Sequence, residues 1–203
     1  MKLGAIPRLI VALLLLLVFS IPHSAAVAQP TLVVLGGDAD QVSISGNEVR
    51  HKAANFLFPE QIGDMPLRKV TIYGSADASV DYTLRGGGNG DAWITFYVYP
   101  AQHALAEEVA TIQSDLIGAW SATRLPSATA LPPSAADGRS GWFKGQYEGK
   151  SATTGYIVVQ RGHGFLMARY TIPDVAGQEG IERTIRALNA APWNWTPAPR
   201  SSA

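Results

Sequence analysis

Three histidines, His51, His103 and His163, are the residues of this chain best suited to acid–base or metal chemistry. No two of them have the spacing of a metal-binding motif such as H-E-x-x-H, and none lies beside an acid in a known motif. The chain has no cysteine, which excludes thiolate nucleophiles, iron–sulfur clusters and cysteine-based zinc sites. We therefore predict no metal, no cofactor and no catalytic residue, although distant residues could still converge on a site.

A glycine cluster, Gly86-Gly87-Gly88-Asn89-Gly90, invites comparison with nucleotide-binding loops. A phosphate-binding loop needs Lys followed by Ser or Thr, and that pair is missing here. A dinucleotide fingerprint needs a third glycine where Asp91 stands, and it opens a helix, whereas strand-like residues follow this cluster. We interpret the cluster as a hairpin turn, because Gly and Asn tolerate positive φ.

Aromatic side chains on two predicted strands are the best candidates for ligand contacts. Trp93, Tyr97 and Tyr99 alternate along one strand and share a face, while Trp142 and Tyr147 lie on another strand. Exposed together, these five side chains would form a stacking platform for a sugar, a peptide or an apolar ligand. The alternative is that they form the core beneath the helices, and their exposure in a structure decides between the two.

The elements that would position these residues follow from hydrophobic periodicity. Alternating or β-branched runs predict strands, and apolar residues at i, i+4, i+7 and i+11 predict a helix with one buried stripe. The resulting fold class is α+β, a single antiparallel sheet of five to seven strands packed with two amphipathic α-helices. The main strands are expected at 67–73, 79–84, 91–99, 142–147, 153–160 and 164–171, and the helices at 103–120 and 178–189.

The N-terminal 28 residues have the pattern of a cleaved export signal. Lys2 and Arg8 precede an apolar run over 9–21, and Ala26-Val27-Ala28 forms a small-x-small cleavage site before Gln29. The run is shorter than the roughly 20 residues of a spanning helix, so we expect no membrane span after cleavage. An Ala-rich, cysteine-free exported chain favours the bacterial periplasm or the extracellular space.

We expect one domain at 55–193, preceded by a partly ordered extension or an edge hairpin over 29–54 and followed by a disordered tail over 194–203. The chain has 16 basic and 16 acidic residues, and its basic residues are scattered singly. A nucleic-acid-binding protein usually carries a clustered basic face, so nucleic acid is not an expected partner.

The order of predicted elements, a hairpin, a long helix, a meander and a C-terminal helix ending in Pro192-Trp193, resembles the PsbP/DcrB-type α/β sandwich. Short motifs such as YVYP at 97–100 and GWFKGQYEG at 141–149 also look like those of small uncharacterised exported proteobacterial proteins. The resemblance covers roughly residues 55–193. It implies a non-enzymatic accessory or binding protein of an extracytoplasmic compartment, and it carries over no catalytic residue.

The sequence thus favours an exported, non-enzymatic binding or accessory protein with an unknown protein or small-molecule partner. Two alternatives stay open. A cell-envelope hydrolase would need histidines and acids that converge in a concave site. An interaction or inhibitor protein would pair with its partner through a sheet edge.

Overall fold

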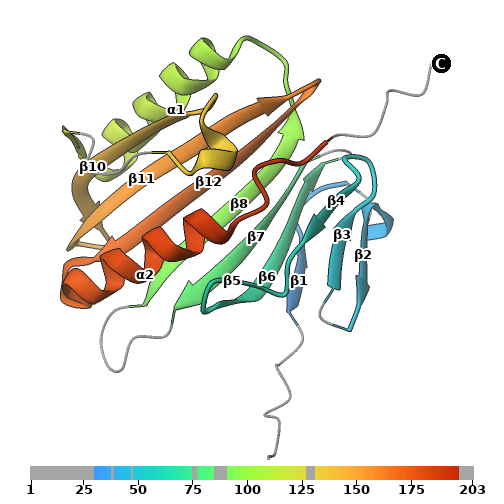
Figure 1. Ribbon diagram of the computed structural model, residues 1–203, viewed down its shortest axis with the longest axis horizontal. Coiled ribbons are helices and arrows are strands. Elements are labelled where there is room, and N and C mark those ends of the chain that lie inside the picture. Colours follow the sequence, from blue (N-terminus) through green and yellow to red (C-terminus); the bar gives the residue numbers. More distant parts are fainter. Residues whose placement is uncertain are drawn as a thin grey trace, which may run out of the picture.

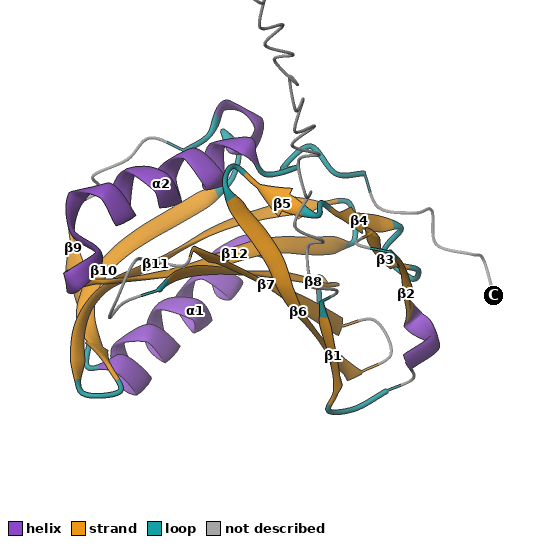
Figure 2. Ribbon diagram, turned by 90° about the horizontal axis from the view of Figure 1, so that it is seen from below, coloured by secondary structure: helices purple, strands orange, loops and turns teal. Residues whose placement is uncertain are grey.

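The computed structural model describes residues 30–37, 39–46, 48–74, 77–84, 91–126 and 131–196. Within them a nine-stranded sheet carries one α-helix on each face (Figures 1 and 2). Its strand order is β1-β6-β7-β8-β12-β11-β10-β9, with β5 paired beside β6. The strands are β1 (Thr31–Val34), β5 (Gln61–Ile62), β6 (Met65–Gly74), β7 (Asp77–Leu84), β8 (Ala92–Pro100), β9 (Thr123–Leu125), β10 (Arg139–Tyr147), β11 (Lys150–Arg161) and β12 (Gly164–Pro173).

A second, three-stranded antiparallel sheet lies beside the large one and is made of β2 (Val42–Ser45), β3 (Glu48–His51) and β4 (Phe56–Phe58). Its apolar residues belong to the same core as those of β6, β7 and β8. The segment that the sequence left open between an extension and an edge hairpin therefore contributes β1, β2 and β3.

The expectation of a single antiparallel sheet of five to seven strands is wrong. The large sheet has nine strands and is mixed, because β1 runs parallel to β6, and residues 42–58 form a sheet of their own. Parallel pairing joins Thr31 to Lys69 and Val34 to Ile72, which are far apart in the chain. Local periodicity shows that a segment is a strand but carries no information on so distant a partner.

Both expected helices are present, as α1 (Leu105–Trp120) and α2 (Gly177–Ala190), and they lie on opposite faces of the large sheet (Figure 2). The α1 helix packs on β10 and β11, where Ile112 and Leu116 meet Phe143 and Val158. The α2 helix packs mainly on β12 and β8 and joins the larger of the two cores. The sheet therefore needs apolar side chains on both faces.

Strand β8 meets this need by alternation. Ile94, Phe96 and Val98 are buried in the core beneath α2, and the alternate residues of the strand, Trp93, Thr95, Tyr97 and Tyr99, point to the face that carries α1. Figure 2 shows the sheet curving around the α1 side, so this face is concave. Since α1 packs mainly on β10 and β11 and reaches β8 at Tyr99, no helix among the described residues covers the concave face over β6 and β7.

The segment after α2 holds the two sheets together. Trp193 is fully buried against Phe96, with ring centroids 5.3 Å apart, and its indole N–H donates to the Leu188 carbonyl. Trp195 packs edge-on against Phe56 of β4 and donates its indole N–H to the Ala54 carbonyl. Aromatic pairs of this kind contribute about 0.5–1.5 kcal/mol beyond the area they bury.

Candidate functional site

The structure separates the five predicted aromatic residues. Trp93, Tyr97, Tyr99 and Tyr147 lie on the concave face, whereas Trp142 lies on the opposite face, in the core beneath α2. The concave-face residues are partly exposed, and Tyr147 reaches 37 % exposure, while Trp142 is 5 % exposed. The five residues therefore form no common platform.

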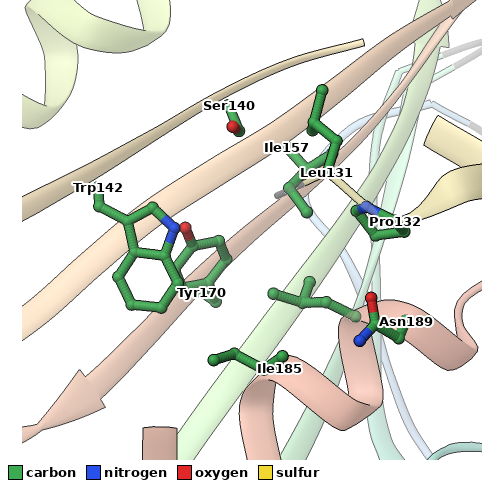
Figure 3. A pocket seen from close by; sticks show the side chains of 9 residues that line it. Leu131, Pro132, Ser140, Trp142, Ile157, Tyr170, Ile185 and Asn189 are labelled. Atoms are coloured by element: carbon green, nitrogen blue, oxygen red, sulfur yellow. The ribbon is translucent and has the colours of Figure 1, made fainter. Parts of the chain in front are cut away.

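Trp142 lines a narrow slot between α2 and the sheet (Figure 3). Tyr170 and Ile157 form the slot's sheet side, and Ile185 and Leu188 come from α2. The enclosed volume is about 20 Å³, room for about one water molecule. The slot holds no ligand-sized space, and the Trp142 ring packs on Tyr170 with centroids 5.0 Å apart.

Three aromatic side chains and one guanidinium lie together on the concave face. We call this group, Trp93, Trp120, Tyr147 and Arg169, the Trp93 cluster. The Tyr147 ring lies between the two indoles, with centroid distances of 4.8 Å to Trp93 and 4.8 Å to Trp120. The Arg169 guanidinium carbon lies 5.0 Å from the centroid of the Trp120 ring, within cation–π range. Burial raises the Tyr147 pKa, and its neighbour Glu148 raises it further.

Local geometry explains why these side chains meet. Trp120 is the last residue of α1, and Gly145 of β10 lets the helix end approach, since a Cβ there would lie 2.9 Å from the Trp120 carbonyl oxygen. Tyr147 pairs with Lys150 across the two-residue turn Glu148-Gly149. Both turn residues have positive φ, as a tight hairpin turn requires.

A shallow surface pocket of about 370 Å³ opens beside this cluster, and we call it the Trp93 pocket. Trp93 and Tyr147 supply its aromatic wall. Its rim is polar and carries carboxylates, an ammonium and a hydroxyl. The complete lining is Asp91, Trp93, Tyr147, Glu148, Lys150, Ser151, Ala152 and Pro173.

A polar row crosses the concave face next to the cluster. Lys69 forms an ion pair with Asp81 at 2.8 Å, and the Thr95 hydroxyl donates to Asp81 at 2.8 Å. The hydrogen bond to Asp81 raises the Lys69 pKa. Burial, followed by nearby Tyr73, raises the pKa of Tyr97 to about 12, so this phenol is a neutral hydrogen-bonding group at physiological pH.

Tyr99 belongs to a different contact at the start of α1. Its hydroxyl donates to Glu108 at 2.5 Å, and the second Glu108 oxygen lies 2.5 Å from His103 Nε2. Glu108 is 7 % exposed. Burial and the hydrogen bond to Glu108 raise the Tyr99 pKa. The contacts among Tyr99, Glu108 and His103 tie the first turn of α1 to the end of β8.

The three candidate histidines, His51, His103 and His163, lie on different elements. His51 ends β3 and is fully buried, His103 precedes α1, and His163 lies in the turn between β11 and β12. Across the described residues no group of three or more His, Cys, Asp or Glu side chains could hold a metal ion. His103 and Glu108 do converge, and the hydrolase alternative remains a prediction.

Two residues of the Trp93 cluster, Trp120 and Arg169, were not predicted from the sequence. Trp120 follows Leu116 by four residues, so it continues the apolar stripe of α1, and this spacing could have marked it. Arg169 reaches the cluster through the pairing of β12 with β8, in which it lies opposite Thr95. No feature of the sequence shows that pairing. The glycine cluster at 86–90 lies outside the described residues.

The part of the chain that the structure describes contains no helix long and apolar enough to span a membrane. The chain matches no protein-family model, no curated protein and no solved structure.

Proposed function

We propose that this protein is an exported, non-enzymatic binding protein and that the Trp93 pocket is its ligand site. The observation that carries the proposal is the Trp93 cluster, in which Tyr147 lies between Trp93 and Trp120 at a partly exposed surface. A large apolar side chain that is fully buried contributes about 1.5–3 kcal/mol to stability, and an aromatic ring left partly exposed loses part of that contribution. Aromatic rings kept at a surface beside a polar-rimmed pocket are typical of ligand sites.

The concave face supports this proposal in a second way. The α1 helix packs mainly on β10 and β11 and reaches β8 at Tyr99, so among the described residues no helix covers the surface over β7, beside which Thr95 and Tyr97 of β8 are partly exposed. A ligand in the Trp93 pocket would extend along this surface. The residues it would meet are the neutral phenol of Tyr97, Thr95 and the paired charges of Lys69 and Asp81.

Thermal shift measurements against a broad panel test the binding proposal while the ligand is unidentified. The panel contains neutral sugars, organic cations, amino acids, nucleotides and fatty acids. A ligand at 100 times its Kd stabilises the folded state by about 2.7 kcal/mol, and for a protein of this size each kcal/mol raises Tm by roughly 2–4 °C. We expect at least one class to raise Tm by several degrees.

The variants Trp93→Ala and Tyr147→Ala locate the response. Ile117→Ala is the matched control, because Ile117 is 51 % exposed on α1 and does not line the pocket. The shift should disappear in the first two variants and persist in the control. A flat response of the unmodified protein to the whole panel, or equal shifts in Trp93→Ala, would overturn the proposal.

Export is a separate part of the proposal, supported by the positive residues, the apolar run and the cleavage site of the first 28 residues. N-terminal sequencing of the protein from a bacterial host tests it. We expect Gln29 as the first residue and recovery outside the cytoplasm. Recovery of an uncleaved cytoplasmic chain would refute this part and leave the ligand site unaffected.

A further inference from the structure

We propose that the ligand of the Trp93 pocket is a neutral sugar, whose ring stacks on Trp93 and whose hydroxyl groups bond to the pocket rim. This inference rests on the proposed function and specifies its ligand class. It follows from the shape of the aromatic wall, the mixture of charges on the rim and the geometry of the hairpin turn that supplies most of that rim.

The aromatic wall is suited to a ring with apolar faces and polar edges. Trp93 and Tyr147 are inclined at 59° to each other, so the pocket has two non-parallel aromatic surfaces rather than one flat sheet. A pyranose ring presents C–H groups on its faces and hydroxyls around its edge. Aromatic side chains bind such faces by dispersion and by contact with the negative face of the ring.

The wall is also held in place before any ligand arrives. Tyr147 is held between Trp93 and Trp120, and Arg169 lies over Trp120. Fixing side chains in advance reduces the conformational entropy that binding would otherwise lose, about 0.5–1.5 kcal/mol for each rotamer-rich side chain.

The rim provides both hydrogen-bond acceptors and donors. Asp91 and Glu148 carry carboxylates, Lys150 carries an ammonium and Ser151 a hydroxyl. Sugar hydroxyls donate and accept, so they can bond to carboxylates and to the ammonium at the same time. A ligand that has only hydrogen-bond donors or only acceptors would bond to only part of this rim.

The charges of the rim argue against the main competitors. A phosphate or nucleotide would place its negative charge beside two carboxylates, and an organic cation would face Lys150. With two acids and one base the rim has a formal charge of −1, which disfavours an anion and offers an organic cation only one net charge, opposed locally by Lys150. The volume of about 370 Å³ lies in the range of small-molecule sites, about 300–1,000 Å³.

The hairpin that supplies most of the rim ends in a tight two-residue turn. Glu148 and Gly149 have φ of 51° and 73°, and Tyr147 pairs with Lys150 directly beneath them. Glu148 is not glycine at this left-handed position, where a residue with a Cβ is disfavoured. The turn thereby places the Glu148 carboxylate in the lining of the pocket.

Isothermal titration calorimetry and tryptophan fluorescence test the inference on the full chain, purified from a host that processes its N-terminus. The probes are neutral hexose and N-acetylhexosamine oligomers, choline as the organic cation and inorganic phosphate. We expect one of the sugar series to bind and to shift the tryptophan emission to shorter wavelength, because the ring covers Trp93. Choline and phosphate should not bind.

Two variants and a control locate the sugar. Trp93→Ala should weaken sugar binding at least tenfold. Glu148→Gly removes the carboxylate and relieves the positive φ, so this variant should fold normally and bind about three- to tenfold more weakly. Ile117→Ala should bind like the unmodified protein.

The outcomes separate the two proposals. If choline or phosphate binds in a Trp93-dependent way and no sugar does, the sugar inference fails and the binding function stands. If a sugar binds equally well to Trp93→Ala, the inference and the assigned site both fail. If no probe binds while the wider thermal-shift panel shows a Trp93-dependent ligand, the sugar inference alone is overturned.

Discussion

Replacing Glu108 with Ala should destabilise the protein by removing the junction between β8 and α1. The Glu108 carboxylate accepts a hydrogen bond from Tyr99 at 2.5 Å and lies 2.5 Å from His103 Nε2. Glu108 is 7 % exposed, so its carboxylate is largely shielded from water. The variant leaves the Tyr99 hydroxyl partly buried without its acceptor.

The size of the effect follows from the two contacts. A hydrogen bond to a charged group contributes about 1.5–3 kcal/mol, and the Tyr99 contact belongs to this class. The His103 side chain is 36 % exposed, and a polar contact this open to solvent contributes about 0–1 kcal/mol. Together these contacts predict a loss of about 1.5–4 kcal/mol for Glu108→Ala.

Urea unfolding followed by tryptophan fluorescence measures this loss. Glu107→Ala is the matched control, since Glu107 is exposed in the same helical turn and interacts mainly with the helix dipole, at about 0.3–1 kcal/mol. A cycle with Tyr99→Phe should give a coupling of at least 1 kcal/mol, about the value of one hydrogen bond. A loss below about 0.5 kcal/mol for Glu108→Ala, or no coupling to Tyr99, would show that the junction does not depend on this carboxylate.

Three further predictions concern packing and pH. Gly155→Ala should cost about 3 kcal/mol of unfolding free energy, because its Cβ would lie 2.2 Å from the Tyr170 hydroxyl and 2.4 Å from the Gly141 carbonyl oxygen; a urea midpoint equal to that of the unmodified protein would contradict this. Gly118→Ala, in the open on α1, should instead raise Tm through a gain of about 0.5–1 kcal/mol. Burial lowers the His51 pKa in the folded state, so the unfolded state binds the proton first and stability should fall as pH drops below about 6.5. A urea midpoint that falls equally in His51→Gln would show that other groups cause the loss.

The sequence predicted individual elements well because their signals are local. Ile94, Phe96 and Val98 alternate with aromatic residues along one strand, and the structure buries the first three under α2 while the others point to the concave face. The prediction that β8 uses both faces is confirmed. The apolar stripes also located both helices to within a few residues.

The composition of the aromatic site could not be predicted because it depends on register. Trp142 pairs with Gly155, which pairs with Tyr170, which pairs with Ile94. Trp142 therefore shares a face with Ile94 and lies on the side opposite Trp93. Alternation assigns residues to the two faces of one strand, but only the pairing of all four strands shows which faces coincide.

Separation along the chain also limited how much of the sheet order could be predicted. The antiparallel strands β10, β11 and β12 follow one another in the chain and were predicted as a meander. Strand β1 pairs with β6 and not with a neighbour in sequence, and it sets the parallel edge of the sheet. The proposed resemblance to the PsbP/DcrB-type sandwich remains a prediction.

The contact between Trp195 and the three-stranded sheet has a consequence for how the chain is synthesised. Its indole donates to the carbonyl of Ala54, 141 residues earlier, and packs on Phe56. A ribosome releases the N-terminal strands long before it adds this residue, so their docking cannot be completed while the chain is still growing. The three-stranded sheet therefore gains this contact only after residue 195 has emerged, and until then its unpaired strand edges are the kind of surface that favours aggregation.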